Sequence, residues 1–238
     1  MKKLDNIVNL TKEKDKIINP VQEIIQEAEL ITIERSDRNK DGLLLAADGK
    51  PSHYQNELYW KMIKTESFAK WFQGSVVIHK DNKEPLLIFH STLKREIIGE
   101  NLRPNEKADD WNPYGVYFSS NKKATIDFYN TQYKDDIDRF KRLSKEDSID
   151  KDGVLSDKEE YMAENEGQVK TFGAFAKIEK PLKLEGHDEL MEISWAGFNR
   201  QDLLKEYDGI IVNNDTDFSD QYIIFKEENI LILPSVLD

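Results

Sequence analysis

Hydrophobic residues near the start of the chain follow the spacing of an amphipathic helix. Val21, Ile24, Ile25 and Ala28 occupy positions i, i+3, i+4 and i+7, and Pro20 stands where a first helical turn begins. The pattern predicts a helix packed on the rest of the domain, with a partner-binding or oligomerising helix as the alternative.

Short apolar and β-branched runs bounded by turn residues dominate the rest of the chain, and each predicts a strand. The runs are residues 76–78, 85–90, 114–119, 171–184, 210–212, 221–225 and 230–233. Helical spacing returns in residues 56–63, 122–133 and 200–207. Because helices gather near the N-terminus and strands in the C-terminal half, without regular alternation, the sequence predicts an α+β fold.

The composition narrows the classes of function. Acidic residues outnumber basic ones, so the net charge is -12 at pH 7 while 34% of the residues are charged. A protein that holds duplex nucleic acid needs clustered Lys and Arg, so this balance argues against such a partner and against a nuclease-like toxin. The absence of cysteine excludes disulfides, thiolate nucleophiles and cysteine-ligated metals.

The hydrophobic pattern also bears on the cellular location of the protein. The chain contains no apolar run near the roughly 18 residues that a membrane span requires. Asp5, Asn6 and Asn9 interrupt the run behind the N-terminal lysines, so no signal peptide is predicted. We therefore expect a soluble protein with no membrane partner, either cytoplasmic or delivered outside the producing cell by another route.

Residues 135–170 are the most acidic and polar part of the chain, and we predict that they form an insertion. One loop inside it has the oxygen spacing, the central glycine and the final glutamate of an EF-hand calcium loop. The candidate calcium ligands are Ser148, Asp150, Asp152, Ser156 and Glu159. A solvated helical hairpin is the alternative interpretation.

Two other polar features are predicted to be surface structure rather than metal sites. Asp37 to Gly42 has a partial calcium-loop spacing, but a surface turn explains it better. His79 and His187 lie near predicted turns, and no spacing of His with Asp or Glu indicates a zinc site.

Two predicted strands carry the residues that suggest a binding or catalytic site. One ends on the polar triplet His90, Ser91 and Thr92, and the other holds Tyr117 two residues after Gly115. We predict that His90 and Tyr117 line one cleft. The alternative is structural: a hydrogen-bonded histidine at a strand end and a tyrosine packed in the core.

Several motifs occur in a recognisable order. They are Leu44–Ala46 with Gly49–Ser52, Phe68–Phe72, the strand ending at Thr92, Gly115–Ser119, Lys177–Leu182, Tyr207–Ile211, and Gln221–Phe225 with Asn229–Ile230. Together, over roughly residues 43–234, they resemble the ADP-ribosyltransferase-like domain of phage and mobile-element polyvalent proteins. The resemblance implies the architecture of diphtheria toxin and poly(ADP-ribose) polymerase, in which split antiparallel β-sheets clasp NAD in a cleft.

The same resemblance implies the domain organisation and the function. An N-terminal helical segment, residues 1–42, would precede an ADP-ribosyltransferase-like domain at 43–238. The protein would be a toxin or effector that uses NAD as its substrate and transfers ADP-ribose to a protein or nucleic-acid acceptor.

The roles of individual residues follow from the resemblance as well. His90, followed by Ser91 and Thr92, would hold the adenosine ribose. Tyr117 would stack on the nicotinamide, with Phe128 or Tyr129 as a second aromatic wall.

Gln221 and Ser91 depart from the family pattern. Gln221 stands at the acidic position, and an amide orients a ribose hydroxyl without supplying the negative charge that an oxocarbenium-like state needs. Ser91 replaces a glycine that lets backbone groups approach the nicotinamide. The alternative function is therefore a catalytically weakened module that binds NAD, ADP-ribose or a protein partner.

Overall fold

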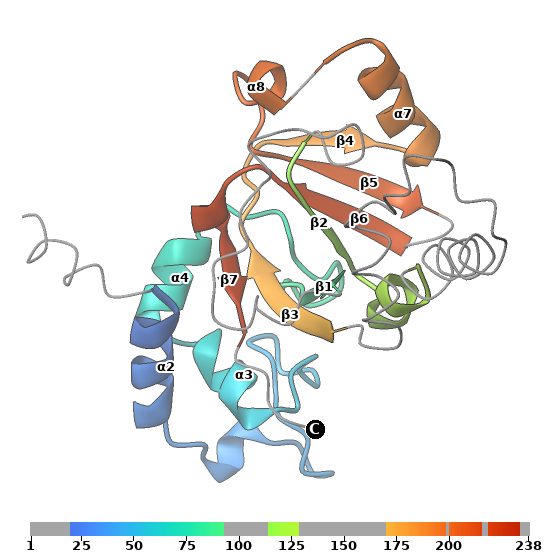
Figure 1. Cartoon of the computed structure of the whole chain (residues 1–238). Helices are drawn as coiled ribbons and strands as arrows, with labels where there is room; N and C mark the ends of the chain where they lie inside the picture. The colour runs from blue at the N-terminus through green and yellow to red at the C-terminus, as the bar shows by residue number, and fades with distance from the viewer. Residues whose placement is uncertain (1–19, 93–113, 129–169, 199, 216–218, 234–238) are drawn as a thin grey trace, which may run out of the picture. The chain divides into compact units, whose positions relative to one another are not determined.

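The computed structural model describes residues 20–92, 114–128, 170–198, 200–215 and 219–233 (Figure 1). The chain divides into two compact units, Met1–Pro85 and Leu86–Asp238. Helices make up the regular structure of the first unit and strands dominate the second, so the predicted α+β class is confirmed.

The first unit contains helices α2 (Pro20–Leu30), α3 (Glu57–Met62) and α4 (Glu66–Phe72), and α2 contacts both of the others. The predicted helices around Ala28 and Trp60 are thus confirmed. Side chains cap two of them: Asn56 accepts from the first turn of α3, and Thr65 accepts from Phe68 at the start of α4. In the part of the chain that the structure describes, no helix is long and apolar enough to cross a membrane.

The loops of the first unit contain isolated bridges and a 3-10 turn, η1 (Arg35–Asp37). The run at residues 76–78 was predicted to form a strand, but it makes one bridge, between Ile78 and Pro85, around a tight turn. That prediction is wrong because residues on either side of the bridge find no continuous ladder partner.

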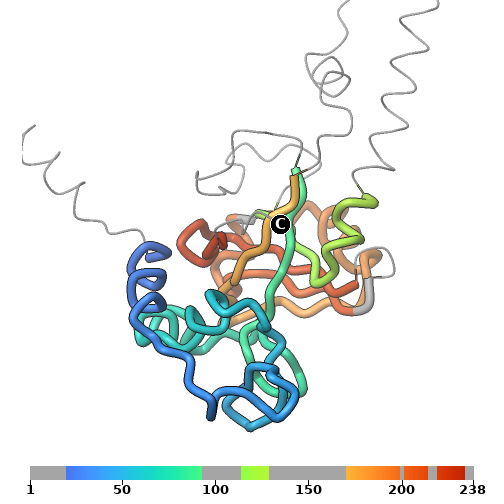
Figure 2. Tube along the Cα trace, turned by 90° about the horizontal axis from the view of Figure 1, so that it is seen from below, coloured from blue at the N-terminus to red at the C-terminus, as the bar shows by residue number. Residues whose placement is uncertain are grey.

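The second unit is built on a seven-stranded sheet in the order β4-β5-β6-β2-β1-β3-β7. Its strands are β1 (Ile88–Thr92), β2 (Val116–Ser119), β3 (Lys170–Ala176), β4 (Pro181–Leu184), β5 (Gly209–Asp215), β6 (Ser219–Ile224) and β7 (Ile230–Ile232). Strands β1 and β3 pair over five residues. The two strands lie side by side in Figure 2. The strands predicted around Phe118, Ile211, Ile223 and Leu231 are confirmed.

Residues 171–184 do not form the single strand that the sequence predicted. β3 ends at Ala176, and Pro181 to Leu184 pair in parallel with β5 at the other edge of the sheet. Helices α7 (His187–Trp195) and α8 (Arg200–Leu203) follow, and η3 (Glu227–Asn229) precedes β7. Leu190 and Leu203 join a buried cluster with Ile210, Val212 and Ile223, so the apolar sides of α7 and α8 pack on this face of the sheet.

The sheet is nearly divided between β1 and β2. These two strands share one residue pair, Phe89 with Ser119, whereas β2 pairs with β6 over four residues. The half made of β4, β5, β6 and β2 is thus joined narrowly to the half made of β1, β3 and β7.

Candidate functional site

His90 lies at the narrow join between β1 and β2. Its Nδ1 donates a hydrogen bond to the backbone carbonyl oxygen of Tyr117 at 2.7 Å, and its ring contacts Phe118 and Phe172. Burial lowers the pKa of the His90 imidazole, while the bond to Tyr117 acts in the opposite direction. The ring is therefore neutral at pH 7, with the proton on Nδ1 and a free lone pair on Nε2.

The imidazole takes the place of a missing ladder bond. The Tyr117 carbonyl is directed at β1, yet the β1–β2 ladder does not extend to this residue. A buried carbonyl without a donor costs about 1–3 kcal/mol, and the ring of His90 supplies the donor. The histidine thus allows the two half-sheets to separate beyond Phe89.

Tyr117 does not present its phenol to His90. Residues that face each other across a ladder lie on one side of the sheet, so Ser119 and Gln221 share a side with Tyr117, two residues before Ser119. Tyr117 packs against the buried cluster under α7 and α8. Burial, with a smaller effect of Tyr114, raises the pKa of Tyr117, so the phenol keeps its proton.

His90 therefore projects on one side of the sheet and Tyr117 on the other. The structure brings the His90 ring to the backbone of Tyr117 and leaves the two side chains apart. The sequence could not indicate this, because the register between β1 and β2 decides which residues share a side.

Gln221 is buried, with 7% of its surface exposed. It pairs with Ser119 on β2 and with Val212 on β5. Among the described residues its Oε1 has no hydrogen-bond partner, which is rare for a buried amide. The atom is an available acceptor for a hydroxyl or amide group.

Gln221 and four other polar residues gather on one side of the sheet, and we call these five the polar cluster. They are Ser91, Ser119, Thr125, Thr171 and Gln221. Ser91 Oγ bonds Thr125 Oγ1 at 2.9 Å and Thr171 Oγ1 at 2.7 Å, which ties β1 to β3 and to the helical residues 122–128. Such a buried set is stable only when its polar atoms are paired, and among the described residues Gln221 Oε1 is the atom of this set without a partner.

The remaining predicted NAD-binding residues are Thr92, Phe128 and Tyr129. Thr92 ends β1, is buried and faces Lys170 of β3. Phe128 is 38% exposed at the end of the described helical residues. Tyr129 and the calcium candidates Ser148, Asp150, Asp152, Ser156 and Glu159 lie outside the described residues.

The loop from Asp37 to Gly42 is a turn, as predicted. Asn39 Oδ1 accepts from the backbone of Asp41 and Leu43, and Gly42 has a φ of 82°. The oxygen spacing that resembled a calcium loop serves the turn itself.

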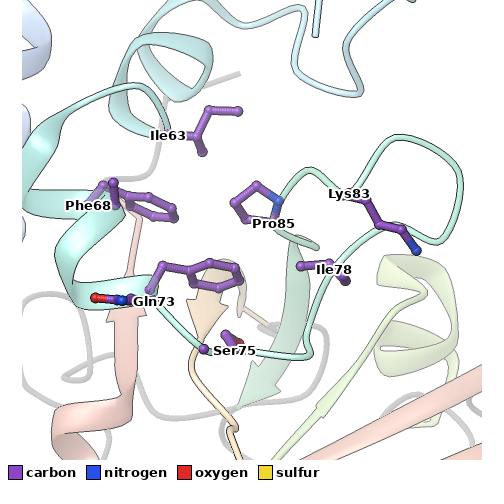
Figure 3. A pocket seen from close by; sticks show the side chains of 10 residues that line it. Ile63, Phe68, Gln73, Ser75, Ile78, Lys83 and Pro85 are labelled. Carbon is purple, nitrogen blue, oxygen red and sulfur yellow. The ribbon is translucent and has the colours of Figure 1, made fainter. Parts of the chain in front are cut away.

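An open apolar pocket of about 340 Å³ lies in the first unit. Phe68 and Ile63 lie across it from Pro85, with Ile78 and Lys83 beyond (Figure 3). Gln73, Ser75 and Lys83 supply the polar side chains of its lining, and the other lining side chains are apolar.

Three ligand-type side chains meet elsewhere in the first unit. His53 Nε2 donates to both oxygens of Asp81, at 3.0 and 3.2 Å, and the rings of His53 and His79 stack 3.6 Å apart. Burial and then the charge of His53 lower the pKa of His79. The sequence predicted His79 to be a surface residue near a turn, but its ring is half-buried against His53. No local pattern indicates this contact, because the two histidines lie far apart in the sequence.

Comparison of the chain with protein families, with curated proteins and with solved structures finds no match.

Proposed function

We propose that this protein is an NAD-dependent mono-ADP-ribosyltransferase with an ADP-ribosyltransferase-like fold. The observation that carries the proposal is the narrow join between the two half-sheets, where His90 replaces a ladder bond. The resemblance implies split antiparallel sheets; the single mixed sheet of this chain narrows to one residue pair beside the strand that carries His90. On this basis the protein acts as a toxin or effector, with a protein or nucleic-acid acceptor.

The tautomer of His90 supports a role in binding ribose. With its proton held on Nδ1 by Tyr117, the neutral ring offers Nε2 as an acceptor. A ribose hydroxyl is a matching donor. Because the ring is fixed between Phe118 and Phe172, little rotamer freedom is lost on binding.

Gln221 supports a role in orienting a ribose hydroxyl, on the side of the sheet opposite to the His90 ring. Cleavage of the bond between nicotinamide and ribose develops positive charge on the sugar, and a nearby acceptor oriented toward a ribose hydroxyl stabilises it. The unpaired Oε1 of Gln221 is such an acceptor, but it carries no full charge. The proposed reaction is therefore slow.

A second candidate is a module that binds NAD or ADP-ribose without efficient cleavage. Gln221 favours it, and so does the packing of the Tyr117 phenol into the buried cluster. In this case the nicotinamide lacks the tyrosine that the resemblance implies.

The replacement of Gln221 by Glu separates the two candidates. We expect purified wild-type protein to release nicotinamide from labelled NAD slowly, and Gln221→Glu to do so at least about tenfold faster, since a preoriented charge contributes several kcal/mol. Gln201→Glu adds the same charge at an exposed position of α8 and should leave the rate of nicotinamide release unchanged.

The outcomes distinguish the candidates clearly. NAD binding without nicotinamide release in either protein supports the binding module. A wild type as fast as Gln221→Glu eliminates it. Failure of the wild type to bind NAD or ADP-ribose contradicts both.

A further inference from the structure

His53, His79 and Asp81 lie close enough to share one ion. Their ligand atoms all fall within 4.8 Å of one another. Around a tetrahedral zinc, bond lengths near 2.0–2.1 Å place neighbouring ligand atoms about 3.3 Å apart. His53 Nε2 and Asp81 Oδ1 are already 3.0 Å apart, so a cation can replace the proton that now joins them.

The types of ligand select the class of metal. Two imidazoles and one carboxylate suit zinc and other first-row divalent ions, whereas calcium and magnesium prefer oxygen ligands only. Three protein ligands leave a fourth position for water, as in open zinc sites. His53 and Asp81 are exposed, so an ion reaches the site from solvent.

Glu84 holds the two contributing segments together. This buried carboxylate accepts from Ser52 Oγ at 2.7 Å, from the His53 backbone at 2.9 Å and from Asn82 Nδ2 at 2.9 Å. The turn that carries His79 is closed by backbone bonds from His79 to Glu84 and from Lys83 to His79. The backbone of the ligands is therefore positioned without a metal, which lowers the cost of binding one.

One side chain has to move. The rings of His53 and His79 are parallel within 4°, and parallel stacked rings cannot direct their in-plane lone pairs at one ion. A turn of the His79 ring about its side-chain bonds brings its nitrogen to the ion and opens the stack. The movement stays within one side chain because the turn is fixed by its backbone bonds.

We infer that His53, His79 and Asp81 form a binding site for a single first-row divalent cation of the zinc type. Asp81 and His53 already lie as two neighbouring ligands, and His79 becomes the third ligand once its ring turns. The site lies wholly in the first unit and is independent of the proposed NAD chemistry.

Calorimetric titration of the chelator-treated full chain with zinc chloride tests this inference. We expect one saturable site that magnesium and calcium do not occupy. His79→Phe keeps a ring for the stack and Asp81→Asn keeps an acceptor for His53, but each should weaken zinc binding at least about tenfold. His187→Ala removes an imidazole from the exposed start of α7 and should leave the affinity unchanged.

Histidine NMR signals provide the second measurement. Zinc should shift the ring signals of His53 and His79 and leave that of His187 in place. The inference is overturned if zinc does not saturate the wild type, or if His79→Phe and Asp81→Asn bind it as tightly as the wild type does. Should His79→Phe fail to fold, the exposed Asp81→Asn decides the question.

Discussion

His90 combines a structural and a binding property in one imidazole. Its Nδ1 satisfies the Tyr117 carbonyl where the β1–β2 ladder stops, and its Nε2 remains an acceptor. Burial favours the neutral ring, so protonation of His90 opposes folding.

The stability of the protein should fall with pH in a way that depends on His90. Its pKa in the fold is below the ordinary 6.5, so from about pH 6.5 downward the unfolded chain takes up a proton that the folded chain does not. The stability contributed by the neutral ring is present above pH 6.5 and lost as the pH falls toward the folded pKa, by up to about 1.4 kcal/mol per unit.

Urea unfolding at several pH values measures this effect. We expect the stability difference between wild type and His90→Gln to shrink as the pH falls below about 6.5. A stability difference that stays constant with pH would contradict the assigned protonation state.

At the scale of elements, the close approach of β2 to β6 requires Gly115. A Cβ at Gly115 would lie 2.3 Å from the carbonyl oxygen of Ile224, which is a backbone atom that cannot rotate away. The pairing of Val116 with Ile224 therefore depends on glycine at the preceding position.

Gly115→Ala should destabilise the protein by about 2–4 kcal/mol, because β2 has to shift from β6 to admit the methyl group. Gly173→Ala is the matched control: there the nearest atom is Leu87 Cδ1, 3.0 Å away, and that side chain can move. Thermal or urea unfolding of both variants measures the difference. Equal losses would show that the β2–β6 contact adapts.

Most elements could be predicted from local patterns. The helical spacing around Ile24 and the strand patterns around Ile211 and Ile223 reproduce α2, β5 and β6. The errors lie where pairing with a distant strand decides the secondary structure. Residues 181–184 look like the end of β3 in the sequence, but they pair in parallel with β5.

The sequence named residues of the candidate site but did not predict their arrangement. His90 and Ser91 on β1 and Gln221 on β6 belong to one sheet, with β2 between their strands. The side on which each projects, and the contact of His53 with His79, required the register and the loop geometry.

At the scale of the whole molecule, the excess of acidic residues bears on partners. A net charge of -12 repels the phosphates of duplex DNA over distances up to the Debye length, about 8 Å at physiological salt. The proposed acceptor is accordingly a protein or a nucleic acid held by local contacts.

We expect no saturable binding of a labelled DNA duplex at about 0.15 M salt, measured by fluorescence anisotropy with protein up to tens of micromolar. Lower salt should not produce the steep gain in affinity that phosphate neutralisation causes. Tight binding with a steep salt dependence would reveal a basic surface and favour a nuclease-like function.

The sequence by itself determined the α+β class, most helices and strands, the acidic balance and the absence of cysteine chemistry. These properties depend on composition and on hydrophobic repeats of two or 3.6 residues, and a short stretch of sequence is enough to show such a repeat. The tertiary structure alone decided the narrow join at Phe89 and Ser119, the opposite sides taken by His90 and Tyr117, and the meeting of His53 with Asp81. These features depend on strand register and on contacts between distant segments. A register shift of one residue moves every side chain of a strand to the opposite face of the sheet.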